Sequence, residues 1–115
     1  MALTIYGIKN CDTMKKAKAW LEKNQVEFVF HDYRKDGIDR KMLTRWLDNL
    51  SWDELINRRG TTWRKLPDTT REKMNKKQAV NLMLEQPAII KRPLLDIDGQ
   101  FTLGFSEENY DKLFS

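Results

Sequence analysis

Cys11 is the residue of this 115-residue chain whose type and position best suit covalent chemistry. It follows residues 3–6, whose alternation predicts a short strand, and precedes residues 12–24, whose apolar spacing predicts a helix. The first turn of a helix presents unpaired backbone N–H groups and the positive end of the helix dipole, which stabilise a thiolate. We therefore expect Cys11 to be a nucleophile with a lowered pKa. The alternative is a small buried apolar residue, the usual fate of a lone intracellular cysteine.

Basic side chains on both sides of the predicted sheet can complete an anion pocket around this thiol. Lys9 and Asn10 form the turn directly before Cys11, and the lysine adds positive charge there. Arg92 directly precedes Pro93 and a predicted apolar strand. Because a guanidinium binds carboxylates and oxyanions in bidentate fashion, Arg92 is a candidate anion ligand.

A second basic stretch covers residues 58–77, which hold eight Lys or Arg against two acidic residues in a chain of net charge +4. Arg58 and Arg59 precede Gly60 on a predicted turn between helices, from which they can reach the mouth of the same pocket. The stretch suits nucleic acid, an anionic small molecule or an acidic protein surface. Surface solvation or structural salt bridges are the alternative for these arginines and for Arg92.

Composition excludes several classes of protein. One Cys and one His leave no disulfide scaffold, no CxxC redox pair and no Cys- or His-based metal cluster. No apolar run approaches the roughly 20 residues that span a bilayer. The first ten residues lack the features of a signal peptide. We therefore expect a cytoplasmic protein with no metal, no bound cofactor and no membrane contact.

The elements that must position Cys11 are predicted in the order β-α-β, helical insertion, β-β-α. Residues 26–30 form the second strand, which is mostly apolar and therefore expected to be buried on both faces. With the strand and helix before it, this strand predicts a right-handed parallel unit. A helical insertion follows at about residues 39–86. Helix caps are expected within it at four residues, which are Asp39, Ser51, Thr69 and Asn75.

The last third of the chain completes the sheet. Residues 88–90 are expected to be extended, and Asp98-Gly99 indicates a two-residue hairpin turn between strands 94–97 and 100–103. Ser106 is expected to cap a last helix with Tyr110, Leu113 and Phe114 on its inner face. The predicted fold class is α/β, a single domain (residues 1–115) with a thioredoxin-like mixed β-sheet and helices packed on it.

Three motifs in this order resemble the arsenate reductase (ArsC) family, in particular its short YffB-type and Spx-like branch. They are N-C-D-T-x-K-K-A after the first strand, N-R-R-G-T-T-W-R-K-L in the middle and I-K-R-P-L-L before the hairpin. The resemblance spans essentially the whole chain. It implies a thioredoxin-like fold with a helical insertion, in which the X-Pro bond before the strand is often cis and faces the cysteine. It also implies that Cys11 is the catalytic thiol, Arg92 an oxyanion or glutathione contact, and Arg58 or Arg59 a second basic ligand.

The chain departs from the arsenate reductases proper at two places. They carry a histidine four residues before the cysteine, where this chain has Gly7. They also carry a third arginine between the last strand and the last helix, where this chain reads Leu-Gly-Phe-Ser. Spx-like regulators use a CxxC switch and bind RNA polymerase, but Met14 stands where the second cysteine of that switch would be.

We therefore expect a glutathione-dependent thiol reductase that acts through Cys11, with glutaredoxin as a further possible partner. An oxidised Cys11 must be resolved by an external thiol through a mixed disulfide, because the chain has no second cysteine. The alternatives are an Spx-like regulator that binds a protein such as RNA polymerase through the 58–77 surface, and a true arsenate reductase. Nucleic-acid binding is disfavoured, since Trp20 and Trp46 fall on helical core stripes rather than among exposed basic residues.

Overall fold

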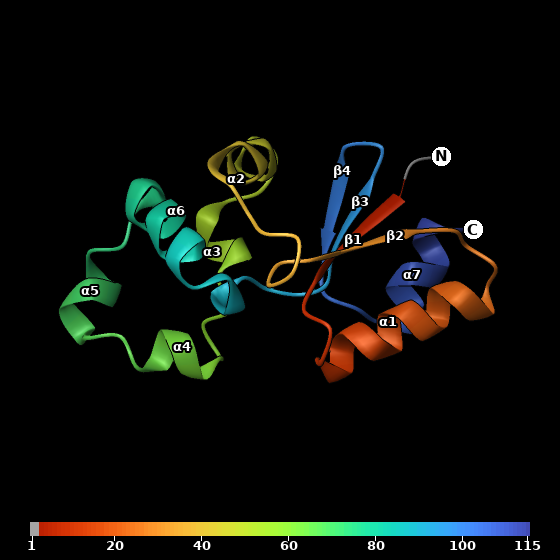
Figure 1. Cartoon of the computed structure of the whole chain (residues 1–115), viewed down its shortest axis with the longest axis horizontal. Coiled ribbons are helices and arrows are strands. Elements are labelled where there is room, and N and C mark those ends of the chain that lie inside the picture. The colour runs from red at the N-terminus through yellow and green to blue at the C-terminus, as the bar shows by residue number, and fades with distance from the viewer. Residues whose placement is uncertain (1–2) are drawn as a thin grey trace. The chain divides into compact units, whose positions relative to one another are not determined.

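The computed structural model describes residues 3–115 and divides into two compact units (Figure 1). The first unit consists of Met1–Asp32 and Arg92–Ser115, and the second of Tyr33–Lys91. The predicted helical insertion at about residues 39–86 falls inside the second unit. The candidate thiol Cys11 and its candidate ligand Arg92 both belong to the first unit.

The first unit contains a mixed four-stranded sheet in the order β2-β1-β3-β4. Strand β1 pairs in parallel with β2 and antiparallel with β3, which in turn pairs antiparallel with β4. Together with the structural relatives described below, this arrangement confirms the predicted thioredoxin-like α/β class. The strands are β1 (Leu3–Gly7), β2 (Val29–Asp32), β3 (Leu94–Ile97) and β4 (Gln100–Leu103).

The prediction for the second strand was wrong in its bounds and in its burial. Strand β2 starts at Val29 rather than at residue 26, and it lies at an edge of the sheet. The Val29 side chain is 65% exposed, while Phe28 and Phe30 pack against the core. An apolar run therefore does not mark a strand covered on both faces here, because alternate side chains of an edge strand can face solvent.

Two helices of the first unit, α1 (Asp12–Lys23) and α7 (Glu107–Leu113), lie side by side in Figure 1. Their buried side chains join the sheet residues in one core that includes Ile5, Leu95 and Tyr110. Helix α7 begins as predicted, since Ser106 Oγ accepts a hydrogen bond of 3.1 Å from the Asn109 N–H. Leu113 is 38% exposed, so the prediction that it lies on the inner face was wrong.

The hairpin between β3 and β4 follows the prediction closely. Asp98 and Gly99 both have positive φ, at 51° and 90°, as a type I′ turn requires. The Asp96 carboxylate accepts a 2.8 Å hydrogen bond from the Gly99 N–H, which secures the turn from within β3.

The second unit is helical. Asp39 and Asn75 cap their helices as predicted, each accepting a 2.9 Å hydrogen bond from the backbone N–H three residues on. Ser51 also precedes a helix with a capping box, in which its N–H donates to the Glu54 carboxylate. The helices are α2 (Arg40–Leu47), α3 (Trp52–Leu55), α4 (Thr61–Arg64), α5 (Asp68–Glu72) and α6 (Lys76–Glu85).

Two predictions within the second unit were wrong. Thr69 is not a cap, because α5 begins one residue earlier, with Pro67 in the capping position. The fixed φ of proline suits a helix start, so the chain enters α5 ahead of the Thr69–Glu72 pattern. The expected extended chain at residues 88–90 is found only at Ile90, which bridges to Ile56, since Pro87–Ile89 form the 3-10 turn η1.

Candidate functional site

Cys11 occupies the N-cap position of α1. Its backbone is extended, with φ −117° and ψ 129°, and its carbonyl accepts the first helical hydrogen bond from the Lys15 N–H at 3.0 Å. The side chain is half-buried against the core of the first unit. It is a free cysteine. The thiol is thus held by packing on one side and accessible on the other.

The pKa of the Cys11 thiol lies below its ordinary value. Burial is the largest single influence, and it raises the pKa because it disfavours the charged sulfur. The backbone N–H groups of Met14 and Thr13 and the Arg92 guanidinium lower the pKa, and together they outweigh burial. This agrees with the expectation from the helix N-terminus.

Arg92 acts on the sulfur both through a hydrogen bond and through its positive charge. The sheet explains how it reaches the thiol, because Tyr6 near the end of β1 pairs with Leu94 at the start of β3. The residue before β3 and the residue after β1 therefore meet at the same end of the sheet. The Arg92–Pro93 peptide bond is cis, and the Pro93 carbonyl accepts a 2.9 Å hydrogen bond from the Gly104 N–H after β4.

Gly7 and Met14 are in close contact. A Cβ placed on Gly7 would lie only 2.3 Å from Met14 Sδ, and Met14 itself is 1% exposed. A side chain at position 7 would therefore require the buried end of Met14 to shift. Gly7, which replaces the histidine of the arsenate reductases, and Met14, which replaces the second cysteine of the Spx switch, thus pack against each other.

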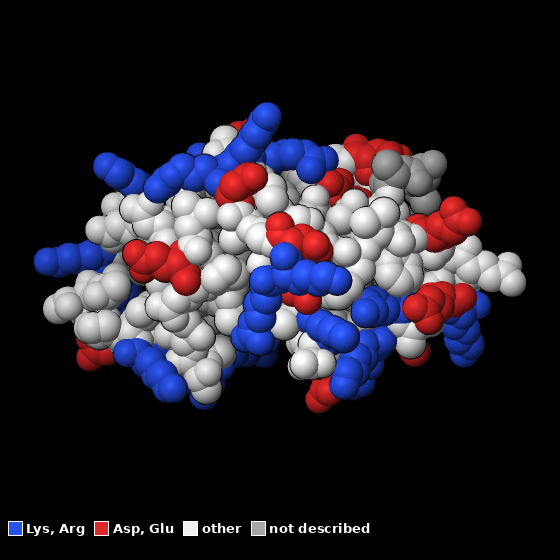
Figure 2. Space-filling view, viewed as in Figure 1, with Lys and Arg blue, Asp and Glu red and all other residues white. Residues whose placement is uncertain are grey.

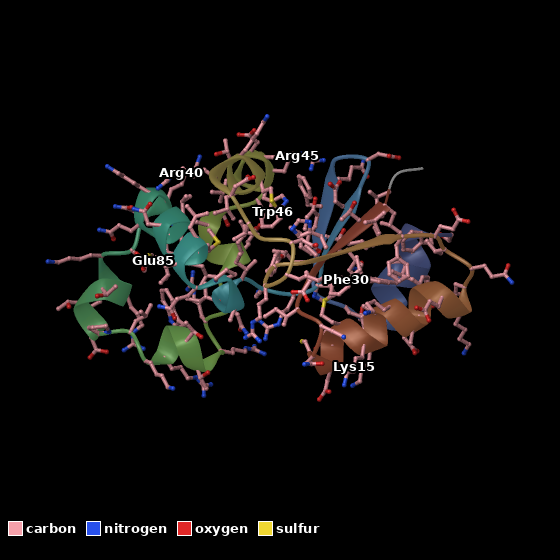
Figure 3. All side chains as sticks on the ribbon, viewed as in Figure 1. Lys15, Phe30, Arg40, Arg45, Trp46 and Glu85 are labelled. Atoms are coloured by element: carbon pink, nitrogen blue, oxygen red, sulfur yellow. The ribbon has the colours of Figure 1, made fainter. Side chains whose placement is uncertain are left out.

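Lys9 and Asn10 lie in the exposed turn between β1 and Cys11. Lys15, labelled in Figure 3, projects from the exposed side of the first turns of α1. Lys9 and Lys15 place positive charge two residues before and four residues after Cys11. Any direct contact of Lys9 or Asn10 with a bound anion stays a prediction.

Arg58 and Arg59 belong to the second unit. Arg58 pairs with Asp53 at 3.1 Å and lies over the Trp52 ring at 5.9 Å, while its side chain stays 52% exposed. Arg59 is exposed, and its backbone N–H donates to Asn57 Oδ1 at 3.2 Å. A role for either arginine at Cys11 stays a prediction.

The structure brings the predicted residues Cys11 and Arg92 together, and their roles in catalysis stay predictions. The contact between Gly7 and Met14 has no signal in a single sequence, because it depends on how closely α1 approaches β1. Within residues 3–115, no three His, Cys, Asp or Glu side chains come together as a metal site needs. None of the described helices has the length and apolar character needed to cross a membrane.

Comparison with known proteins identifies the family. The ArsC family model matches residues 6–113. The chain is 43% identical to the solved structure of a YFFB protein, with a TM-score of 0.92 over 99% of this chain and 100% of that one. It is 49% identical to the structure of an arsenate reductase (ArsC) related protein from Brucella melitensis, with a TM-score of 0.85 over 100% of this chain and 96% of that one. The chain belongs to the ArsC family.

A further relative is the global transcriptional regulator Spx of Streptococcus pneumoniae. It is 29% identical over 108 residues, which cover 92% of this chain and 80% of the regulator. The chain is thus similar both to a protein described as related to arsenate reductase and to one described as a transcriptional regulator.

Proposed function

We propose that this protein is a thiol-dependent oxidoreductase of the ArsC family, in which Cys11 is the nucleophile and glutathione the co-substrate. The observation that carries the proposal is the thiolate-stabilising position of Cys11, at the N-terminus of α1 beside Arg92. A thiolate is the reactive form of cysteine, so a lowered pKa favours attack at neutral pH.

The proposed cycle uses two exchange steps. The Cys11 thiolate attacks a disulfide R–S–S–R′, forms the mixed disulfide Cys11–S–S–R and releases R′–S⁻. A glutathione thiolate then attacks the mixed disulfide at the sulfur of R, restores the Cys11 thiolate and leaves as glutathione–S–S–R. The substrate disulfide is reduced and glutathione is oxidised. An external thiol is required because the sequence holds one cysteine.

Arg92 has two roles in this proposal. Its guanidinium stabilises the Cys11 thiolate, and it can bind a carboxylate of glutathione through charge-assisted hydrogen bonds. Such bonds contribute roughly 1.5–3 kcal/mol, equivalent to about a ten- to hundredfold change in affinity. Glutaredoxin is a further candidate partner, since it acts on mixed disulfides with glutathione, and the cytoplasm is the compartment that supplies both.

The test combines substitution at both residues with direct detection of the mixed disulfide. Cys11→Ser should abolish reduction of disulfide substrates while the circular dichroism spectrum stays unchanged. Arg92→Ala should weaken glutathione binding about ten- to hundredfold, and Arg92→Lys should restore it only in part, because an ammonium lacks the planar fork. If Cys11→Ser keeps its activity, or if mass spectrometry detects no Cys11 adduct during turnover, the proposal fails.

A second candidate function is that of an Spx-like regulator that binds an acidic protein surface. Two observations favour it, namely the similarity to Spx and the exposed basic stretch of residues 58–77. Helices α4 and α5 in this stretch have no buried residue, and Figure 2 shows further basic side chains gathered over α2, where Figure 3 labels Arg40 and Arg45. Tight binding of RNA polymerase, without glutathione contacts near Cys11, would favour this function over the reductase.

A further inference from the structure

A groove runs between α1 and α7 in the first unit, on the helix that carries Cys11 at its N-terminus. It consists of two hollows of about 470 and 390 Å³ that share Trp20, Asn24 and Asp111. The larger hollow reaches Lys16 on α1 and Phe105 in the segment after β4. Because the two hollows share part of their walls, they form one continuous surface feature.

The floor of the groove is aromatic and firmly packed. The Trp20 ring contacts Tyr110 edge-on at 5.4 Å and Phe114 at 5.6 Å, and Phe105 meets Tyr110 edge-on at 4.7 Å. Tyr110 is fully buried, whereas the other three rings are half-buried. Half-buried rings held by edge-to-face contacts offer an apolar surface that is ordered before a ligand arrives.

The two rims of the groove carry opposite charge. Lys16 and Lys23 line it from α1, while Glu107 and Asp111 line it from α7. All four side chains are exposed, and in the described part of the chain none of them forms an ion pair. An apolar floor between unpaired charges of opposite sign matches a polypeptide segment that has an apolar side chain between an acidic and a basic residue.

The groove lies within reach of a substrate whose disulfide is attacked by Cys11. Trp20 is nine residues from Cys11 along α1, about 13 Å at 1.5 Å per residue. An extended peptide covers that distance with about four residues. Phe105 extends the groove toward the same end of the sheet, since the neighbouring Gly104 N–H bonds to the Pro93 carbonyl.

We propose that this groove is a docking subsite for protein substrates whose disulfide is attacked by Cys11. It holds an extended segment with a leucine or aromatic side chain about four residues from the substrate cysteine. The inference rests on the proposed reductase function and names its substrate class as polypeptide disulfides, including cysteines in mixed disulfide with glutathione. The chemical step is the exchange described above, with glutathione as R and the polypeptide as the leaving R′–S⁻. Cys11 takes up the glutathione sulfur as a mixed disulfide, and a second glutathione thiolate then releases it as oxidised glutathione.

The kinetic test compares two short peptides that each carry a glutathionylated cysteine. One has leucine four residues from the cysteine, beside a glutamate, and the other has serine in place of the leucine. We expect the wild-type protein to remove glutathione from the leucine peptide about tenfold faster, as burial of roughly half a leucine side chain implies. The readout is the ratio of the two rates within each variant. An altered reactivity of Cys11 affects both rates equally and therefore leaves this ratio unchanged.

Ala19→Gln blocks the groove with a longer side chain at an exposed position of α1 and should bring the ratio close to one. Its matched control is Glu22→Gln, also exposed on α1 but outside the groove, which should keep the wild-type ratio. Lys23→Glu should lower the ratio about threefold, because it repels the glutamate of the leucine peptide, which docks in the groove, more than that of the serine peptide, which does not. Its control is Lys112→Glu, on α7 outside the groove.

Binding is measured separately from catalysis. A peptide with serine in place of cysteine is titrated into Cys11→Ser and followed by amide and indole chemical shifts. Shifts at Trp20, Ala19 and Asp111 are expected, and their absence, or equal rates for both peptides in the wild type, would overturn the docking proposal. Shifts in the groove without disulfide reduction by the wild type would instead overturn the proposed function and leave the docking surface standing.

Discussion

At the scale of single residues, three groups lower the pKa of the Cys11 thiol, and together they outweigh the effect of its partial burial. Two are backbone N–H groups that every helix N-terminus provides, and the third is the side chain of Arg92. Only the third depends on residue type, so it is the group that substitution can remove. The thiolate is therefore expected to respond to Arg92 more strongly than to any surface lysine.

Arg92→Ala should raise the pKa of Cys11, because the variant loses both a hydrogen bond to the thiolate and a nearby positive charge. At a pH below that pKa, the rate of alkylation should fall in proportion to the thiolate fraction. The measurement is the iodoacetamide rate across a pH titration. Lys15→Ala is the control at an exposed position, and an unchanged midpoint in Arg92→Ala would show that Arg92 does not act on the sulfur.

Tyr110 offers a second prediction at this scale. Its hydroxyl is buried and has no hydrogen-bond partner in the described part of the chain, and burial raises the pKa of the phenol above its ordinary value. Because an unsatisfied buried polar group is destabilising, Tyr110→Phe should leave the free energy of unfolding unchanged or raise it by up to about 1 kcal/mol. Urea denaturation measures this. A loss of stability would reveal a partner for the hydroxyl, such as a buried water.

At the scale of elements, capping residues help to determine where each helix begins. Asn75 accepts a hydrogen bond from the Gln78 N–H at the start of α6, which buries Ala79, Leu82 and Met83. Thr69 matches the same kind of sequence pattern, yet lies inside α5 without capping it. Asn75 and Thr69 therefore allow a cap that the structure forms to be compared with one that only the sequence pattern suggests.

Asn75→Ala should cost about 1 kcal/mol of unfolding free energy, since it leaves a helix N–H without its cap. Thr69→Ala should change stability by no more than roughly 0.5 kcal/mol, as expected for an exposed helical position. Thermal and urea unfolding of both variants test the difference. Equal losses in the two variants would contradict the observed caps.

The same elements show which features of the fold could be predicted from the sequence. The hairpin at Asp98-Gly99 and the helix start at Ser106 were predictable because both depend on local chemistry. The hairpin turn needs residues that adopt a positive φ, and the helix needs a side chain that accepts a hydrogen bond from the N–H three residues on. The existence of strand β2 was predictable, but its burial was not, because exposure at a sheet edge depends on strand order, which local patterns do not contain. Cys11 was predictable from its place before a helix, whereas the contact between Gly7 and Met14 required the packed structure.

At the scale of the whole molecule, the charge is divided unevenly between the two units. Tyr33–Lys91 carries fourteen Lys and Arg against eight Asp and Glu, whereas the rest of the chain carries seven against nine. The unit without the thiol thus holds the entire net positive charge. A partner with an acidic surface would be attracted to that unit, and this attraction should weaken as salt is added.

Arsenate should be a poor substrate for the whole protein. Gly7 has no side chain, and the segment from Leu103 to Ser106 has no cation, so fewer groups are available to stabilise an oxyanion beside Cys11. A coupled assay with arsenate, glutathione and glutaredoxin should show little turnover next to the reduction of disulfides. Comparable turnover of both would show that Arg92 and the helix N-terminus suffice for arsenate.

The contact between Gly7 and Met14 also bears on how this branch of the family can diverge. A histidine at position 7 would collide with the methionine, and a cysteine at position 14 would leave the space above the glycine empty. Either single exchange would therefore overfill the core or leave part of it empty, and overpacking typically costs about 1–3 kcal/mol. Substitutions at positions 7 and 14 are therefore expected to be tolerated better as a pair than singly. Acquiring the upstream histidine or a second thiol would in this way be coupled to the packing between β1 and α1.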